Sequence, residues 1–257
     1  MKLPFSPRTR RARAAGIHLF ASGCVAALVA LVVFGLWYPP PYSTIAAGTT
    51  LFALLISVDV VLGPALTAIA ADPGKAIGAF RRDLAVIVFL QLAGLTYGLY
   101  SIALARPVYL AFEVDRMRVV TAADIDPATL LEAPPQFRAL PWTGPRLIAA
   151  VRPTDPDEVL RSIDLALGGI DISMTPKQWR DVETQREAML RVSRPATDLE
   201  AKYPSAESDL AKLATRSARP LQALRFLPVL GRHSSTVVVI APPDASIVGF
   251  LPYDGFF

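Results

Sequence analysis

The sequence predicts an α+β protein in which a three-helix transmembrane bundle precedes a soluble domain, and two observations carry this prediction. Residues 1–105 contain three apolar stretches, at about 17–38, 45–70 and 84–105. Each is long enough for a helix to cross a bilayer, which takes about 20 residues. Residues 106–257 contain no comparable stretch and carry charged residues every few positions. We therefore expect a membrane domain over 1–105 and a water-soluble α+β domain over 106–257.

The distribution of cations predicts how the three stretches are oriented. The cations before residue 106 are Lys2, Arg8, Arg10, Arg11, Arg13, Lys75, Arg81 and Arg82. Because short cytoplasmic segments are enriched in Lys and Arg, we expect the N-terminus and the loop after the second stretch to be cytoplasmic. The uncharged, aromatic and proline-rich connector Trp37–Tyr42 then lies on the outer face, as does the domain after the third stretch. In a bacterium, this is a multi-pass inner-membrane protein with a periplasmic C-terminal domain.

A cleaved signal peptide is the main alternative for the first stretch. The stretch lacks a small-x-small cleavage site and runs into Trp37, Tyr38 and three prolines, so we expect it to be retained. The only cysteine, Cys24, lies in this stretch. The soluble domain therefore has no disulfide, and we expect it to fold by hydrophobic packing alone.

Strand signals lie at both ends of the soluble part. Runs of β-branched and aromatic residues predict strands at 107–114 and 116–120, either as a pair or as one bent strand, and another at 147–151. Two further strands, 237–240 and 246–251, flank a proline-containing tight loop. Helices are expected between these two groups, which is the pattern of an α+β domain.

Three helices are predicted from capping residues, prolines and apolar spacing. The first runs from Pro156 to the Gly168-Gly169 pair, and Thr154-Asp155 can cap it. Its apolar face consists of Val159, Leu160, Ile163, Ala166 and Leu167. The second starts at Thr175-Pro176 and ends near Val192, with a narrow apolar stripe of Trp179, Val182 and Met189 that predicts a surface position. The third covers about Ser205 to Ser217.

The composition gives little support to catalysis, to a metal site or to nucleic-acid binding. The net charge of +4 comes from the membrane half, so the soluble domain has no basic excess for nucleic acid. His18 and His233 are expected on opposite sides of the membrane, and the common phosphate-loop and hydrolase motifs are lacking. Ser208 and Lys212 are four residues apart on a predicted helix, but we interpret them as a solvated face rather than a catalytic pair. We expect no catalytic residue, no cofactor and no metal.

Asp59 is the residue of the membrane half that most strongly indicates a role, because it lies near the middle of the second stretch. A carboxylate at that depth costs on the order of a few kcal/mol, so it should face protein or water. Two interpretations stay open. Asp59 contacts a partner helix or its amino terminus, or it ties the three helices together through Ser57, Gln91 or Thr96.

Two motifs of small residues and proline indicate where helices bend or approach one another. Gly63-Pro64 follows Asp59 by about one turn, and a proline there removes a backbone hydrogen bond and can kink the helix. Such a kink either opens a lateral groove or has no role. Gly94 and Gly98 form Gly-x-x-x-Gly in the third stretch, which allows close packing among the three helices or against a partner helix.

A series of short motifs covers the membrane half and the entry to the soluble domain in order. These motifs are Leu36–Pro41, Val58–Pro64, Asp72–Lys75, Arg82–Ile87, Gln91–Gly98, Arg106–Tyr109, Phe112–Arg116 and Leu140–Pro145. Together they resemble the type IV pilin accessory proteins of the TfpX/TfpZ family. After about Arg152 the resemblance is less specific and rests on position and size.

The resemblance implies a non-enzymatic, inner-membrane accessory factor that acts as a chaperone. Such a factor binds type IV pilin subunits and promotes pilin stability, pilus assembly and surface piliation. Its partners are the lipid bilayer and the major pilin, through the pilin's transmembrane helix and with its head domain as a further contact. The candidate pilin-binding residues are Asp59, Gly63, Pro64, Gly94 and Gly98.

The alternative is an intramembrane enzyme or a periplasmic ligand sensor with a membrane anchor. Short cytoplasmic segments and the scarcity of His, Cys and paired intramembrane carboxylates disfavour both. Trp142 and Trp179 are further candidates for an exposed binding face. We expect the aromatic tail 252–257 to dock on the soluble domain.

Overall fold

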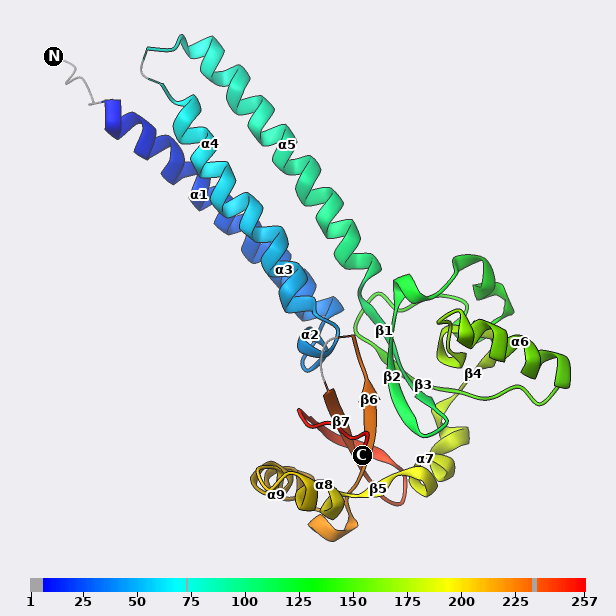
Figure 1. Ribbon diagram of the computed structural model, residues 1–257. Coiled ribbons are helices and arrows are strands. Elements are labelled where there is room, and N and C mark those ends of the chain that lie inside the picture. The colour runs from blue at the N-terminus through cyan, green and yellow to red at the C-terminus, as the bar shows by residue number, and fades with distance from the viewer. Residues whose placement is uncertain (1–6, 73, 233–234) are drawn as a thin grey trace. The chain divides into compact units, whose positions relative to one another are not determined.

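The computed structural model describes residues 7–72, 74–232 and 235–257 (Figure 1). Lys2, Pro73 and His233 of the sequence analysis, and the side chains of Arg8 and Arg10, therefore lie outside the described residues. The chain forms two compact units. One contains the residues up to Leu36 together with Gly48–Leu104, and the other contains Trp37–Ala47 together with Ala105–Phe257.

Three helical segments form the first unit, and each is long and apolar enough to cross a membrane. These segments are Arg11–Trp37, Gly48–Ala70 and Ile77–Leu104. The first consists of α1 (Pro7–Val32) and a π-helical turn (Val33–Trp37), the second of α3 (Gly48–Ser57), a π-helical turn (Val58–Leu62) and α4 (Gly63–Ala70), and the third of α5 (Ile77–Leu104). The three predicted stretches are thus confirmed as helices.

The third helix begins earlier than the apolar pattern indicated. Helix α5 starts at Ile77 and includes Arg81, Arg82 and Asp83, which the sequence analysis placed in a loop. Apolarity marks the part of a helix that lipid can cover, whereas backbone hydrogen bonding continues through charged residues. Lys75 just before the helix forms an ion pair with Asp83 in its first turns, which holds this end together.

Within this unit, α1 packs mainly against α4, and α5 packs against both α3 and α4. At one end, the rings of Phe34 and Phe52 meet edge to face at 5.1 Å. Most large apolar side chains point outward, as lipid-facing residues do; examples are Leu28, Val61 and Leu90.

The second unit is a mixed α+β domain built on one sheet. Its strands are β1 (Pro107–Glu113), β2 (Arg116–Thr121), β3 (Arg146–Ala150), β4 (Trp179–Arg180), β5 (Arg194–Pro195), β6 (Arg225–Leu230), β7 (Ser235–Ala241) and β8 (Ser246–Leu251). The strand order is β4-β3-β1-β2-β6-β7-β8, and β5 pairs with β6. Strands β1 and β2 form an antiparallel hairpin, whereas β1–β3 and β2–β6 are parallel pairs.

Two hydrophobic clusters cover different halves of this sheet. Helices α8 (Ala196–Lys202) and α9 (Ala206–Ser217) pack on β6, β7 and β8, with Leu199, Leu210 and Phe226 fully buried. On β1, β2 and β3 the cover is formed by short 3-10 turns at Ala122–Asp124, Pro127–Glu132 and Pro135–Phe137 and by Trp179. Figure 1 shows α8 and α9 beside the C-terminal strands. Helix α6 (Pro156–Leu167) lies between β3 and β4 in the chain.

Most of the predicted elements of the soluble domain are confirmed. The first strands form a pair, and the strands near 147–151, 237–240 and 246–251 are present as β3, β7 and β8. Helix α6 begins at Pro156 and is capped by Asp155, whose carboxylate accepts hydrogen bonds from two backbone N–H groups. Helix α9 matches the predicted third helix. The tail docks as expected, because the Phe257 ring contacts Tyr203 and Phe226.

The predicted surface helix from Pro176 to Val192 is wrong. This segment is a 3-10 turn (Pro176–Gln178), β4, a second 3-10 turn (Val182–Gln185) and α7 (Arg186–Val192). Trp179 is fully buried, and its indole Nε1 donates a hydrogen bond to Ser173 O at 2.8 Å. As a residue of β4, it is paired in the sheet with Ala150 of β3. Core packing of the tryptophan and sheet pairing therefore override the local helix signal. Burial also removes Trp179 as a candidate for an exposed binding face.

The connector Trp37–Ala47 is part of the soluble unit and contains the short helix α2 (Tyr42–Ile45). Tyr38 and Ile45 are buried, with 0% and 2% of their surface exposed. The Tyr42 ring meets Phe250 of β8 edge to face at 5.7 Å. The connector is therefore an integral part of the soluble domain, although the rest of that domain begins only at Ala105, 60 residues after Ile45.

Candidate functional site

Asp59 lies in a π-helical turn, Val58–Leu62. Pro64 explains why the backbone oxygen of Asp59 has no hydrogen-bond partner within this turn. In a π-helical turn, a carbonyl pairs with the N–H five residues later. For Asp59 that residue is Pro64, which has no N–H. The Gln91 side chain of α5 takes this place, because its Nε2 donates to Asp59 O at 3.3 Å. The proline therefore creates a free backbone acceptor that a second helix satisfies.

Polar groups from all three helical segments gather around this turn. His18 of α1 and Thr67 of α4 share a hydrogen bond, with Nδ1 and Oγ1 2.6 Å apart. The Asp59 side chain is buried, with 9% of the residue exposed, and His18 is near enough to interact with it electrostatically. We call His18, Asp59, Thr67 and Gln91 the intramembrane polar cluster. It combines a carboxylate, an imidazole, a hydroxyl and an amide at the centre of an otherwise apolar unit.

Gly63 makes this cluster possible by permitting a close approach of helices. A Cβ atom at this position would lie 2.8 Å from His18 Nε2 and 3.0 Å from Gln91 Cδ, which is closer than such atoms tolerate. Any larger residue would therefore have to displace the His18 and Gln91 side chains that reach the π-helical turn. The structure brings the predicted residues Asp59, Gly63 and Pro64 together in one place.

Of the three residues that the sequence offered as partners of the Asp59 carboxyl, Gln91 does contact Asp59, but it donates to the backbone oxygen. Ser57 and Thr96 instead donate to carbonyls of their own helices, Leu54 O and Leu92 O. His18 was missed, because a histidine near the start of an apolar stretch looks like an interfacial residue until the helices are paired.

The two glycines of the Gly-x-x-x-Gly motif have different surroundings. Gly98 faces Leu55 of α3, where a Cβ would meet the leucine Cγ at 3.4 Å. Gly94 has open space around it, with no heavy atom within 4 Å of a Cβ position. Gly94 is exposed on α5, between the contacts made at Gln91 and at Gly98. An exposed glycine permits close approach of another helix.

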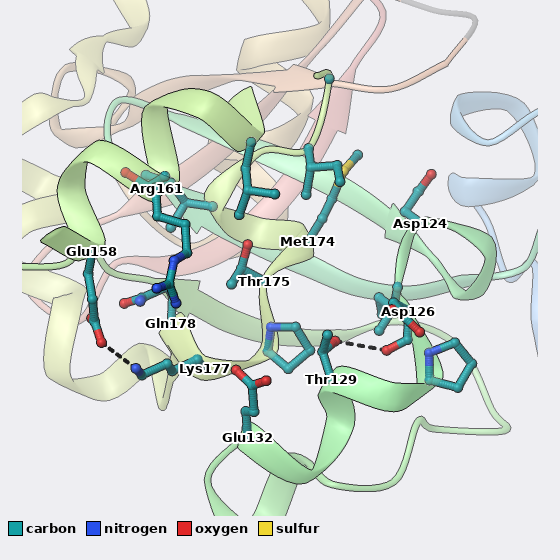
Figure 2. Close-up of a pocket in the computed structure, with 18 of the residues that line it drawn as sticks. Asp124, Asp126, Thr129, Glu132, Glu158, Arg161, Met174, Thr175, Lys177 and Gln178 are labelled. Carbon is teal, nitrogen blue, oxygen red and sulfur yellow. Dashed lines mark hydrogen bonds and ion pairs between the residues drawn. The ribbon is translucent and has the colours of Figure 1, made fainter. Parts of the chain in front are cut away.

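The soluble unit contains a separate open cleft with a volume of about 790 Å³ (Figure 2). One wall is formed by residues 123–132 and the other by α6 and residues 169–178. Figure 2 shows Glu158 paired with Lys177 on one side of the cleft and Asp126 beside Thr129 on the other. The cleft thus has charged walls contributed by segments far apart in the sequence.

Other residues singled out by the sequence have local roles. Lys212 pairs with Asp209 at 2.9 Å, and Ser208 is exposed on α9, which agrees with a solvated polar face. Trp142 is exposed, and the Arg106 guanidinium lies over its ring at 4.7 Å. Burial lowers the pKa of Arg106, an effect that the nearby Tyr38 opposes. Among the described residues, no three His, Cys, Asp or Glu side chains come together in a possible metal site.

Comparison with known proteins gives a consistent set of relatives. The family model described as "Fimbrial assembly protein FimB" matches residues 7–47. The fimbrial assembly protein of Dichelobacter nodosus serogroup I is 34% identical over 246 residues, which cover 95% of this chain and 96% of that protein. The fimbrial assembly protein of serogroup E1 of the same organism is 32% identical over 246 residues, which again cover 95% of this chain and 96% of that protein. The protein of serogroups C1 and C2 is 42% identical over 49% of this chain and 92% of its own length. No solved structure matches.

Proposed function

The chain belongs to the fimbrial assembly protein family, and from this premise we propose that it is an accessory factor for type IV pilus assembly that binds pilin subunits. Within this role we assign it the activity implied by the TfpX/TfpZ resemblance, a non-catalytic chaperone of the pilin. The observation that carries the proposal is the intramembrane polar cluster, with the exposed Gly94 one turn from Gln91 on α5. A factor that only anchored a soluble domain would need neither feature.

The proposed location is the bacterial inner membrane, with the N-terminus cytoplasmic and the domain after Leu104 periplasmic. Arg11 and Arg13 near the start of the first span, and Lys75, Arg81 and Arg82 around the turn into α5, support this orientation through the positive-inside rule. A pilin subunit has an apolar helix and a head domain on the outer side, so both of its parts would meet a matching surface.

The proposed mechanism divides the candidate residues into two roles. Asp59, Gly63 and Pro64 fix the π-helical turn and the polar cluster, while Gly98 sets the distance between α3 and α5. Gly94 then offers an exposed small residue against which the pilin helix packs closely. Small residues allow such close approach between helices in lipid, where van der Waals packing and hydrogen bonds replace the hydrophobic effect.

The first test places a bulky side chain at Gly94. Gly94→Phe should lower the amount of pilin that co-purifies with the full-length protein from membranes by about tenfold, or about 1.4 kcal/mol of binding free energy, because the ring prevents the close approach of the pilin helix. Gly23→Phe on α1 is the matched control, since Gly23 also has open space around it. Equal pilin recovery with Gly94→Phe and with Gly23→Phe would refute a docking role for Gly94.

The second test addresses the polar cluster. Asp59→Asn keeps the size of the side chain but removes its charge, and we expect weaker pilin co-purification together with normal expression and folding. Ser57→Ala is the control, because among the described residues Ser57 donates only to the carbonyl of Leu54 in its own helix. Full pilin recovery with correctly folded Asp59→Asn would limit the cluster to holding the three helices together. Loss of binding in both tests would identify the membrane unit as the pilin-helix receptor.

A further inference from the structure

The cleft of the soluble unit contains one buried polar side chain whose amide has no hydrogen-bond partner among the described residues. Gln178 lines the cleft, and 9% of its surface is exposed. The hydrogen bonds that it makes within the described part of the chain involve its backbone N–H, which donates to Thr175 O, and its backbone carbonyl, which accepts from Val151 N. The side-chain amide is not sealed in the core, so its donor and acceptor face the cleft. A polar group that is taken out of water without a partner costs free energy, and a ligand that pairs with it would remove this cost.

The backbone holds Gln178 firmly in this position. Its two backbone hydrogen bonds, each 3.0 Å long, tie it to Thr175 and to the residue that follows β3. The next residue, Trp179, begins β4 and is anchored by its fully buried ring. A polar group on such a rigid support loses little freedom when a ligand binds, so the amide is preorganised for an interaction.

The rest of the cleft interior is mainly apolar. Ile125 is buried, and Leu165, Ile172 and Met174 are half-buried. Figure 2 shows Met174 and Thr175 pointing into the space between the two walls. An apolar lining with a few placed polar groups is the usual composition of a ligand site.

The charged residues of the lining are of both signs. They are Asp124, Asp126 and Glu132 on one wall and Glu158, Arg161 and Lys177 on the other. Two of the anions are ion-paired, one with Lys177 and one with Arg232. Within the described ranges this leaves Arg161 without an ion pair on the α6 wall, and Asp126 and Glu132 without one on the facing wall (Figure 2). A strongly charged ligand of either sign would be repelled by one of the walls, so the cleft favours a ligand without net charge.

Three further arginines lie near α6 but outside this cleft. Arg116, Arg118 and Arg152 line a separate recess, which shares only Ser162 and Ile172 with the lining of the cleft. Two of these arginines are ion-paired with carboxylates of that recess. The charge balance inside the cleft therefore depends on its own lining residues.

The side-chain amide of Gln178 has the same hydrogen-bonding groups as a peptide bond. It offers a carbonyl oxygen as an acceptor and an NH2 group as a donor. A backbone peptide group of an extended chain offers one N–H and one C=O, so the two can form a pair of hydrogen bonds. Main-chain hydrogen bonds of this kind are how extended peptides gain affinity, while pockets for their side chains give specificity.

A free carboxylate is a poorer match for the same groups. It would accept from Gln178 and Arg161, but it would face the carboxylates of Asp126 and Glu132 across the cleft. An uncharged peptide backbone avoids this repulsion, and its N–H groups suit the acceptors of that wall. An extended, mainly apolar peptide segment is therefore the ligand that the chemistry of the cleft favours.

We propose that the cleft binds an extended, uncharged and mainly apolar peptide segment of the pilin head, with Gln178 paired to a backbone peptide group of that segment. This inference rests on the proposed function and deepens it by naming a contact in the soluble unit. Gln178 selects an extended backbone, and the apolar lining receives the side chains of the segment.

The experiment measures peptide binding to the full-length protein in lipid nanodiscs. The probes are overlapping synthetic peptides, each with a fluorescent label, that together cover the head of the pilin produced by the same cells. At least one uncharged, apolar peptide should bind saturably. Gln178→Leu, which keeps the size of the side chain but removes the amide, should weaken this binding about tenfold. Gln222→Leu is the matched control, because Gln222 is exposed on the 3-10 turn Leu221–Ala223 and does not line the cleft.

A second pair of variants blocks the cleft without changing Gln178. Ala123→Trp places a large ring at an exposed position of the lining and should lower peptide binding below detection. Ala128→Trp is its control, since Ala128 is exposed in the same wall segment but does not line the cleft. Thermal unfolding of each variant measures whether the fold is intact. Because Ala123 is exposed, its substitution tests the cleft even where Gln178→Leu lowers stability.

The outcomes separate this inference from the proposed function. Unchanged binding in either Gln178→Leu or Ala123→Trp overturns the inference. Binding confined to basic or acidic peptides, with a steep dependence on salt, also overturns it, because such binding requires a charged occupant. If full-length pilin co-purifies with the parent protein but no head peptide binds, the cleft inference fails and the proposed function stands. If neither pilin nor any peptide binds, both fail.

Discussion

Tyr38 shows how a single buried side chain joins the connector to the soluble domain. Its ring is fully buried, and Arg106 and Arg232 from distant parts of the domain are near its hydroxyl group. Burial raises the pKa of Tyr38 above the ordinary value of 10.0, because the phenolate would lose its hydration, and the two arginines oppose this only in part. The native state therefore retains this proton at a pH at which the unfolded state has lost it.

This difference in proton binding predicts a loss of stability in alkali. Above about pH 10 the unfolded state binds fewer protons than the native state, so the free energy of unfolding falls as the pH rises, by about 1.4 kcal/mol per pH unit for one such tyrosine. Below pH 10 Tyr38 is protonated in both states and contributes no slope. Tyr38→Phe should remove its share of the alkaline slope in denaturant titrations of the full-length protein. An identical slope in the variant would show that Tyr38 ionises normally.

At the scale of single elements, the contact between α3 and α5 depends on a glycine. Gly98 faces the side chain of Leu55, whereas Gly94, one turn earlier on the same helix, has open space. Gly98→Val should therefore destabilise the membrane unit by about 1–3 kcal/mol through overpacking. Gly94→Val is the control and should change stability little. Thermal unfolding in detergent measures both, and equal effects would contradict the assigned packing of α5.

How far the sequence predicts an element depends on how local its determinants are. Helix α6 was predicted correctly because its start, cap and end are encoded in neighbouring residues. The segment 176–192 was not, because the burial of Trp179 depends on β3 and on Ser173 O. Strand β6 was missed because Pro228 lies within it, and a proline argues against a central strand. The structure accommodates it because, on that side of β6, β5 pairs with Arg225 and Phe226 and β2 pairs with Val229 and Leu230, so neither strand pairs with Pro228.

The residues of the candidate site also divide into those that local sequence identifies and those that depend on tertiary packing. The cost of burying a carboxylate identified Asp59, and backbone chemistry identified Gly63 and Pro64, since these arguments need only the sequence. His18 and Thr67 could not be assigned to the polar cluster from the sequence, because their hydrogen bond depends on the packing of α1 against α4. The apolar face of α6 was visible in the sequence, but whether another element would cover it was a property of the tertiary structure.

At the scale of the whole molecule, the soluble unit is built from two separate parts of the chain. The connector Trp37–Ala47 follows the first helical segment directly and precedes the second, and Ala105 follows the third. The unit is thus covalently joined to the ends of all three helical segments. Because Tyr38 and Ile45 are in its interior, the connector cannot leave the domain without exposing core residues. The proposed topology consequently requires the connector and the C-terminal domain to be on one side of the membrane.

Cysteine accessibility tests that requirement. In a Cys24→Ser background, which removes the only native cysteine, we would place single cysteines at exposed positions through Thr44→Cys, Ala76→Cys and Ser208→Cys. The proposed orientation predicts that a membrane-impermeant maleimide reaches Thr44→Cys and Ser208→Cys from the periplasmic side of intact spheroplasts, and reaches Ala76→Cys only after lysis. The reverse pattern would invert the topology. Labelling of Thr44→Cys without Ser208→Cys would separate two segments that the fold places in one domain, and would therefore contradict both the orientation and the packing of the connector.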